Sequence, residues 1–237
     1  VRMSDERILV SRQGMIGVVT FNRPERRNAF NLPMWRELQR AVEALSAEDG
    51  LRCVVLRGAG TEAFSAGADI LAFAEERGVR IAIEMHPGFC VYSAEHVIAL
   101  REAVGTQNIG ANFDPSHLFW QGVDPVFAIR KLGKAIFHFH AKDCRIDEIN
   151  AGTHGVLDTK SYTDEINRTW IFRTVGYGHD AQVWKDIVSN LRLVGYDWVL
   201  SIEHEDSLMS QNEGFEKAVA FLKQVVISQQ PTEAFWA

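Results

Sequence analysis

Four short apolar segments in the second part of the chain are each followed at once by carboxylate or imidazole side chains. They run into the polar stretches at residues 83–86, 112–117, 138–143 and 202–206. A mixed set of glutamate, aspartate and histidine suits a divalent ion such as Mn²⁺, Mg²⁺ or Co²⁺ and leaves positions for substrate oxygens. Three widely spaced cysteines without CxxC spacing argue against a zinc knuckle or a disulfide framework.

The apolar segments alternate with amphipathic ones, which is the pattern of a parallel sheet with right-handed helical crossovers. In barrels and open α/β sheets, ligand-binding groups gather at the carboxyl ends of the strands. One polar residue at a strand end is more often an ordinary loop residue, but four strands in phase favour a shared site. Strands are predicted over residues 81–85, 109–113, 135–140 and 198–202, and helices over about 93–104, 125–132, 181–194 and 212–225.

The first part of the chain has a different pattern: strand, strand, helix, strand, helix. Strands are expected over residues 8–11, 16–21 and 51–56, and Asn31 can cap the first helix. The small-residue loop 63–70 then leads into the second helix. Small residues let a backbone approach a ligand closely, and free amides at a helix start can hold an oxyanion.

The motifs of the second part resemble the xylose isomerase-like sugar isomerase/epimerase family over about residues 79–226. The stretches that carry the resemblance are IEMHPG, NFDPSHLFWQGVDP, HFHAKDCR, IFRTVGYG and LSIEHEDSLMS. The resemblance implies four metal ligands, which are Glu84, Asp114, His140 and Glu203. It also implies substrate contacts from His117 and Arg145, with Lys142, Asp143 and Arg173 as further motif residues, and Trp120 is near enough in sequence to line a sugar pocket.

The implied chemistry is proton transfer next to a sugar carbonyl. A divalent cation polarises adjacent carbonyl and hydroxyl oxygens, so the intervening C–H becomes acidic and an enediolate is stabilised. Glu84 and Glu203, acting as acid and base, can then remove and return the proton. Ketose/aldose isomerisation and epimerisation of a ketose or an inosose both fit these residues, and the sequence does not choose between them.

The resemblance covers only the C-terminal half of a (β/α)8 TIM barrel, written (βα)4. A four-stranded sheet leaves two edges and one face open. The N-terminal segment could complete a distorted barrel, pack as a separate layer, or leave the edges to a second chain in a homodimer. The long stretch 143–178 is expected to be irregular, and in a complete barrel it would cover the substrate.

The N-terminal segment resembles the enoyl-CoA hydratase (crotonase) family over about residues 7–78, through FNRPERRNAF, VVLRG and AFSAGADI. The resemblance implies that the amide of Ala68 forms half of an oxyanion hole for a thioester, and that Ala66 and Ile70 lie along coenzyme A. The family's second oxyanion glycine and its catalytic glutamates do not follow in the chain. A remnant of a CoA-binding groove in a truncated ββαβα segment is therefore expected, not a hydratase.

Composition divides the chain at the same place. Residues 1–78 contain eleven arginines but no lysine or histidine, and all eight histidines follow residue 78. We therefore expect a crotonase-like fragment over residues 1–78, a half TIM barrel over 79–228 and a tail over 229–237. The chain is interpreted as an α/β fusion of two family fragments.

Charge and hydropathy restrict the partners of the 237-residue chain. A net charge of −6 offers no basic field for nucleic acid, and no segment approaches the ~20 apolar residues of a membrane span. With no apolar signal-peptide core at the start, a cytoplasmic location and a small-molecule sugar are expected. Three hypotheses remain: a working metal-dependent isomerase or epimerase, a fusion that binds metal without turnover, and an acyl-CoA-binding remnant.

Overall fold

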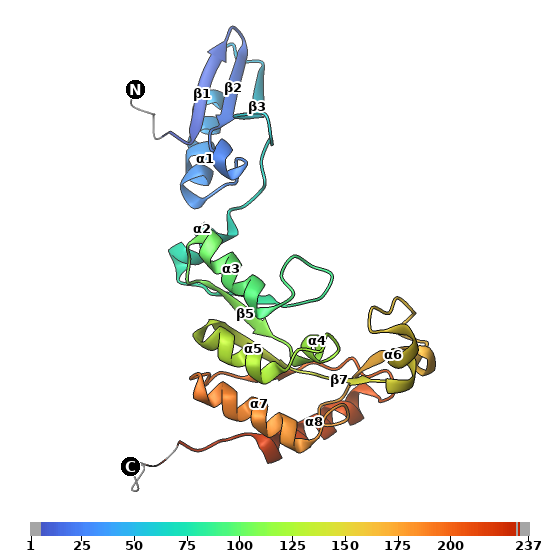
Figure 1. The fold of residues 1–237 in the computed structure, drawn as a ribbon. Coiled ribbons are helices and arrows are strands. Elements are labelled where there is room, and N and C mark those ends of the chain that lie inside the picture. Colours follow the sequence, from blue (N-terminus) through green and yellow to red (C-terminus); the bar gives the residue numbers. More distant parts are fainter. Residues whose placement is uncertain (1–5, 231, 233–237) are drawn as a thin grey trace. The chain divides into compact units, whose positions relative to one another are not determined.

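The computed structural model describes residues 6–230 and 232, and the chain divides into two compact units. The N-terminal unit is Val1–Val79 and the C-terminal unit is Arg80–Ala237 (Figure 1). Most of the predicted tail, residues 231 and 233–237, lies outside the described residues. Within the described part of the chain, no helix has the length and apolar character needed to cross a membrane.

The N-terminal unit is a three-stranded sheet packed on one helix. Strands β1 (Ile8–Gln13) and β2 (Ile16–Phe21) are antiparallel, and β3 (Cys53–Gly58) is parallel to β2. A short 3-10 turn, η1 (Pro24–Arg26), precedes helix α1 (Leu32–Ser46). The side chain of Asn31 accepts a hydrogen bond from the amide of Met34, so it caps α1 as predicted. The core between sheet and helix includes Val19, Phe21, Met34 and Leu45.

Helix α2 (Ile70–Arg77) ends the N-terminal unit, and both of its ends are set by local chemistry. The side chain of Asp69 accepts from the amide of Ala72 at the N-terminus. Gly78 has a φ of +64° at the C-terminus, a left-handed conformation that stops the helix. Strand β4 begins three residues later.

The C-terminal unit is built on a parallel sheet with the strand order β4 (Ile81–Glu84), β5 (Ile109–Phe113), β6 (Ile136–Ala141) and β9 (Leu200–Ile202). Four strand–helix repeats follow the predicted alternation, because each strand leads to one of the longer helices α3 (Ala94–Val104), α5 (Pro125–Leu132), α7 (Ala181–Leu193) and α8 (Gln211–Val225). Two shorter elements are α4 (Pro115–Phe119) and η2 (Gly133–Ala135). Among the described residues, no strand pairs with the outer edges of β4 and β9.

The two faces of this sheet differ in chemistry. Because side chains alternate along a strand, one face carries the large core residues and the other carries polar groups. Ala111, Phe113 and Phe139 are fully buried in the core that the helices share with the sheet. Asn112 and His140, on the opposite face, lie within 3.4 Å of each other and are only partly buried. The helix layer therefore holds the sheet, while the polar face remains available for ligands.

The stretch predicted to be irregular contains a β-hairpin, which corrects that expectation. Strands β7 (Asp143–Ile146) and β8 (Trp170–Arg173) pair in antiparallel register, with α6 (Glu148–His154) and η3 (Glu165–Asn167) between them. Four-residue strands separated by more than twenty residues have no short-range turn signal, so sequence patterns miss them. A separate core of Trp120, Cys144, Trp170 and Phe172 stabilises the hairpin.

Candidate metal centre and substrate pocket

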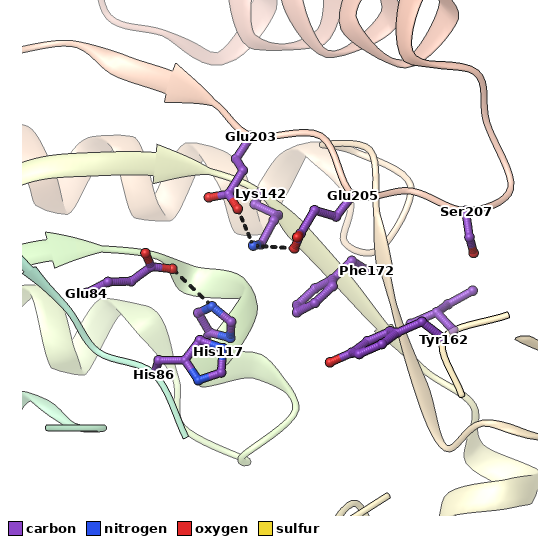
Figure 2. A pocket seen from close by; sticks show the side chains of 10 residues that line it. Glu84, His86, His117, Lys142, Tyr162, Phe172, Glu203, Glu205 and Ser207 are labelled. Atoms are coloured by element: carbon purple, nitrogen blue, oxygen red, sulfur yellow. Dashed lines mark hydrogen bonds and ion pairs between the residues drawn. The ribbon is translucent and has the colours of Figure 1, made fainter. Parts of the chain in front are cut away.

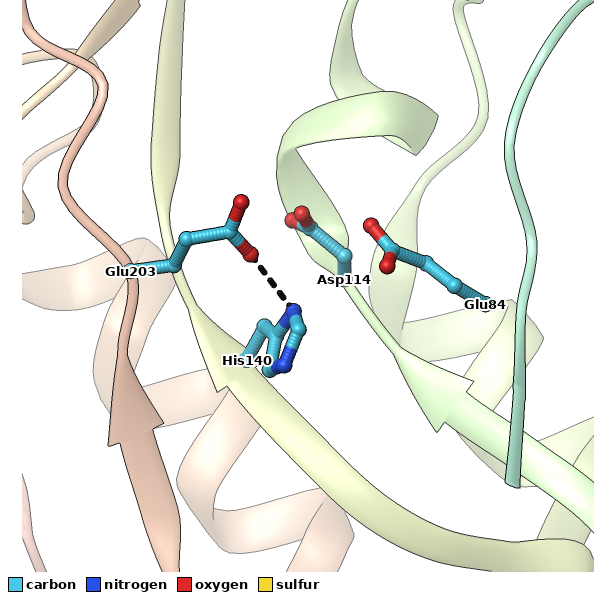
Figure 3. Close-up of side chains that lie close together, drawn as sticks. All are labelled: Glu84, Asp114, His140 and Glu203. Carbon is cyan, nitrogen blue, oxygen red and sulfur yellow. Dashed lines mark ion pairs between the residues drawn. The ribbon is translucent and has the colours of Figure 1, made fainter. Parts of the chain in front are cut away.

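The four predicted metal ligands converge at the carboxyl ends of the parallel strands. Glu84 is the last residue of β4, Asp114 follows β5, His140 lies in β6 and Glu203 follows β9. One ligand atom from each lies within 4.8 Å of all the others. Figure 3 shows Glu84 and Glu203 on opposite sides of Asp114, as expected of residues from the two edge strands.

Unsatisfied buried oxygens show that these residues fit a cation. Asp114 is fully buried; its Oδ1 accepts from the Ser116 amide at 2.8 Å. Its Oδ2 accepts no well-formed hydrogen bond among the described residues, although Nζ of Lys142 lies 3.2 Å from it. Oε2 of Glu203 also lacks a well-formed hydrogen bond, although Nδ1 of His140 lies 2.6 Å from it. Buried oxygens of this kind are costly unless an ion or water satisfies them. Three carboxylates and one imidazole are suitable ligands for Mn²⁺, Mg²⁺ or Co²⁺.

The ligands influence one another's protonation. The close approach of the His140 imidazole, helped by Lys142, lowers the pKa of Glu203 to about 2 despite partial burial. The neighbouring His117 lowers the pKa of Glu84 in the same way, whereas burial raises the pKa of Asp114 against the opposing effect of Lys142. The two glutamates are therefore ionised at neutral pH, which binding of a cation requires.

Lys142 is buried among carboxylates beside the ligand cluster. Its Nζ lies 2.9 Å from Oε1 of Glu203, 2.8 Å from Oε2 of Glu205 and 3.2 Å from Oδ2 of Asp114. Burial alone would lower the pKa of Lys142, but Asp114 and the two glutamates outweigh it and raise the pKa. Nζ also lies 4.4 Å from the centre of the Phe172 ring. Lys142 is thus a fixed positive charge that partly balances the acidic cluster.

A pocket of about 450 Å³ opens beside this cluster (Figure 2). Tyr162 and Phe172 form one wall, with their rings nearly parallel and 6.1 Å apart. His86 and Glu205 belong to the polar stretches of the sequence but were not predicted as site residues, and Tyr162 has no sequence signal because it lies far from any strand end. The lining residues are Glu84, His86, His117, Lys142, Tyr162, Ile171, Phe172, Glu203, Glu205 and Ser207.

Two of the predicted substrate residues, His117 and Lys142, line this pocket. Nε2 of His117 lies 3.1 Å from Oε1 of Glu84. Arg145 and Arg173 instead line a neighbouring cavity of about 420 Å³ that shares only Ile171 with the pocket. The structure does not bring these two arginines to the metal-ligand cluster.

Trp120 and Asp143 lie away from the pocket lining and have structural contacts. Trp120 is stacked on Trp170, with ring centres 4.6 Å apart, inside the core of the hairpin. Asp143 is fully buried and accepts hydrogen bonds from several groups. Its donors are the amides of Cys144, Gly176, Gly178 and His179 and the side chains of His179 and Trp184. Such a carboxylate fixes the loop after β8 rather than a substrate.

The three residues predicted to contact a CoA thioester, Ala66, Ala68 and Ile70, differ in how accessible they are. The amide of Ala66 donates to the carbonyl of Arg27 at 2.9 Å, so it is not free for a ligand. For the amide of Ala68, no acceptor is found among the described residues. Ile70 is 67% exposed, and a cavity of about 510 Å³ is lined by residues of the 24–28 and 59–63 segments.

Residues 61–225 match the family described as xylose isomerase-like TIM barrel. The chain belongs to this family. Residues 16–99 match the enoyl-CoA hydratase/isomerase family, so the N-terminal segment is of the enoyl-CoA hydratase type. The two matches overlap over residues 61–99, which include the boundary between the two units.

Individual relatives show the same division. The chain is 44% identical over 154 residues to the uncharacterized protein YfiH of Bacillus subtilis, covering 65% of the chain and 49% of the relative. It is 32% identical over 178 residues to the rhizopine catabolism protein MocC of Rhizobium meliloti, covering 72% and 52%. A probable enoyl-CoA hydratase of Rhizobium meliloti is 46% identical over 68 residues, covering 29% and 26%. The chain thus spans about half, or less, of these relatives.

Among solved structures, a xylose isomerase domain protein from Planctomyces limnophilus is similar at 24% identity with a TM-score of 0.46. The similarity covers 66% of the chain and 50% of that structure.

Proposed function

We propose that the C-terminal unit is a divalent-metal-dependent sugar isomerase or epimerase, acting on a ketose, an aldose or an inosose. The observation that carries this proposal is the convergence of Glu84, Asp114, His140 and Glu203 within 4.8 Å beside a pocket of about 450 Å³. When bound, a divalent ion would polarise adjacent carbonyl and hydroxyl oxygens of the sugar. In this proposal, the ion and the sugar therefore bind side by side in the same pocket.

Glu84 and Glu203 are placed to move the proton. They come from opposite edges of the sheet and lie on opposite sides of Asp114 (Figure 3), which supports an approach to the sugar from two different sides. One carboxylate removes a proton from the carbon next to the carbonyl and is thereby protonated. For isomerisation the same carboxylate returns this proton at the adjacent carbon, while the hydroxyl proton passes to the former carbonyl oxygen. For epimerisation the other glutamate first takes up a proton from water and delivers it on the opposite face, and the first glutamate releases its own proton to water. His117 and Lys142 each contact one oxygen of a glutamate, at 3.1 and 2.9 Å, and so fix how the two carboxylates are turned.

The unpaired outer edges of β4 and β9 leave one side of the proposed sugar site without a wall. A two-fold axis along the barrel axis would place β9 of one copy parallel to β4 of the other and would close an eight-stranded ring. We propose that a second copy of the chain supplies the missing wall in this way. A single copy would bind the ion but would hold the sugar poorly, because one side of the site is open and positioning is lost.

The test separates ion binding from chemistry. Mn²⁺ is titrated into chelator-treated protein by calorimetry, and solvent deuterium exchange into a panel of ketoses and inososes is followed by NMR. One ion per chain and Mn²⁺-dependent exchange are expected, with both lost in Glu203→Gln. Glu216→Gln is the matched control, because Glu216 is an exposed residue of α8 outside the pocket. Exchange that survives in Glu203→Gln would overturn the proposed role of Glu203.

A second candidate function, acyl-CoA binding, is favoured by the amide of Ala68, which has no acceptor among the described residues. A thioester carbonyl could accept from this amide, although one donor gives only half of an oxyanion hole. Acetyl-CoA binding that is weakened at least tenfold in Ala68→Pro, with an unchanged melting curve, would support this function. The absence of measurable binding by the unmodified protein would exclude it.

A further inference from the structure

We infer that the pocket selects uncharged polyols over phosphorylated or carboxylated sugars, and that Glu205 is the residue that sets this selectivity. The inference rests on the proposed function and names the substrate class for the same site. It is carried by the charges around the pocket and by the way in which each positive charge is already bound.

The pocket contains more negative than positive charge. Glu84, Glu203 and Glu205 line it and Asp114 lies beneath it, whereas Lys142 is the one lysine or arginine among the described lining residues. A divalent ion and Lys142 together balance three of the four carboxylates. Glu205 is the carboxylate outside the ligand cluster, and it shares Lys142 with Glu203 and Asp114, so the group keeps one net negative charge.

Lys142 is not available to an incoming anion. Its side chain is only 2% exposed, and its ammonium lies within 3.2 Å of three carboxylates and against the Phe172 ring. A phosphate would have to displace those carboxylates. Glu205, by contrast, lines the pocket with a side chain that is 50% exposed, so its carboxylate faces any anionic group that occupies the pocket. A second negative charge beside Glu205 is repelled by it, and water at this half-exposed position weakens the repulsion without removing it.

The arginines of the neighbouring cavity do not offset this charge. Arg173 pairs with Asp206 at 3.1 Å, and Arg145 donates to the carbonyl of Gly178 at 3.2 Å. The buried guanidinium of Arg168 donates to the carbonyls of Lys160 and Trp170. That cavity is also lined by three acidic residues, Asp147, Glu148 and Glu165, so its formal charges cancel.

Groups that suit a polyol complete the pocket. The rings of Tyr162 and Phe172 offer an apolar wall for the C–H face of a sugar, while Glu205 and Ser207 offer partners for hydroxyl groups. A carboxylate accepts hydrogen bonds from hydroxyls without needing an opposite charge on the ligand. The pocket therefore has the chemistry of a neutral-sugar site.

The test compares matched neutral and phosphorylated probes on Mn²⁺-loaded protein. Calorimetry gives the dissociation constants of D-fructose and D-fructose 6-phosphate, and of myo-inositol and its 1-phosphate. We expect each phosphate to bind at least tenfold more weakly than its parent. The selectivity ratio is the dissociation constant of the phosphate divided by that of its parent polyol. Glu205→Gln, which keeps an oxygen for Lys142, should reduce this ratio about tenfold or more, and Glu216→Gln should leave it unchanged.

The outcomes distinguish the inference from the function on which it rests. A phosphate that binds as tightly as its parent, or a ratio unchanged in Glu205→Gln, overturns the inference while leaving the isomerase proposal intact. If Mn²⁺ binds but neither parent polyol does, both the inference and the proposed function fail. A lower ratio in Glu216→Gln would show that net charge of the chain, and not Glu205, determines the selectivity, which also overturns the inference.

Discussion

Replacing Lys142 by methionine removes a buried ammonium but keeps most of its volume. Without metal, Asp114 and Glu203 then lose the cation that balances them at 3.2 and 2.9 Å. Removing one partner of a buried ion pair costs about 3–5 kcal/mol, and the partly exposed side chains of Glu203 and Glu205 place this site at the lower end. For a unit of this size, about 3 kcal/mol corresponds to a melting temperature lower by roughly 6–12 °C.

Mn²⁺ should reverse much of this loss, because Lys142 and the ion compete for the same carboxylates. With the ammonium gone, the cluster is more negative, and Mn²⁺ affinity should rise by about tenfold or more. At a concentration near 100 Kd the ion adds about 2.7 kcal/mol to the unmodified protein, and the variant should gain more at the same concentration. Thermal melts with and without Mn²⁺, together with calorimetry of Mn²⁺ binding, measure both effects.

Lys131→Met is the control, because Lys131 pairs with Glu95 on the surface and its side chain is 47% exposed. Surface ion pairs contribute little, so this variant should melt within ~2 °C of the unmodified protein with or without Mn²⁺. If Lys142→Met is as stable as Lys131→Met, Lys142 does not balance the buried carboxylates. If Mn²⁺ raises the melting temperature of Lys142→Met by no more than that of the unmodified protein, Lys142 and the ion do not compete for these carboxylates.

Three further predictions concern other parts of the molecule. Asp143→Asn should lower the free energy of unfolding, measured in urea, by about 2–4 kcal/mol, because an amide nitrogen would face groups that now donate hydrogen bonds to Asp143. Asp186→Asn, at an exposed position, should leave this free energy almost unchanged. Burial raises the pKa of Asp206, but hydrogen bonds from the amides of Thr174 and Leu208 and the Arg173 pair outweigh it and lower the pKa. The stability gained from ionised Asp206 is therefore complete above the unfolded pKa near 3.9 and is lost as pH falls through the lower folded value, so Asp206→Asn should flatten the acid limb of a stability–pH curve. If a second copy completes the site, deuterium exchange per chain should rise with protein concentration while Mn²⁺ stoichiometry stays constant, and sedimentation should show dimers over the same range.

The location of the candidate metal centre could be predicted from sequence because it follows from one rule, whereas the choice of the four ligands among the polar residues there came from the family resemblance. Parallel strands end at a common edge, so residues at four strand ends meet whatever the loops do. Glu84, Asp114, His140 and Glu203 all obey this rule. The alternation of strands and helices could be predicted for a different reason, because hydrophobic periodicity and helix-capping residues are local features of the sequence.

The pocket walls could not be predicted in this way. Tyr162 reaches the site from the β7–β8 hairpin, whose strands are four residues long and whose pairing depends on a core of residues distant in sequence. Asp143 belongs to the same motif as His140, yet its side chain points to buried amides. Motif membership indicates a location, whereas the face of the strand and the hydrogen-bond donors nearby decide the role.

The division of the sheet into two faces leads us to expect that metal binding and turnover can be separated in this chain. The ligand geometry depends on strands that are held from the other side by a fully buried layer including Phe113, Phe139 and Trp184. No part of that layer requires the strands that would complete a barrel. Positioning a sugar is different, because contacts from the open side supply orientation that the four-stranded sheet does not have. The measured affinity for Mn²⁺ therefore reports whether the four-stranded sheet has formed. Turnover also depends on whether a second copy of the chain closes the open side of the site.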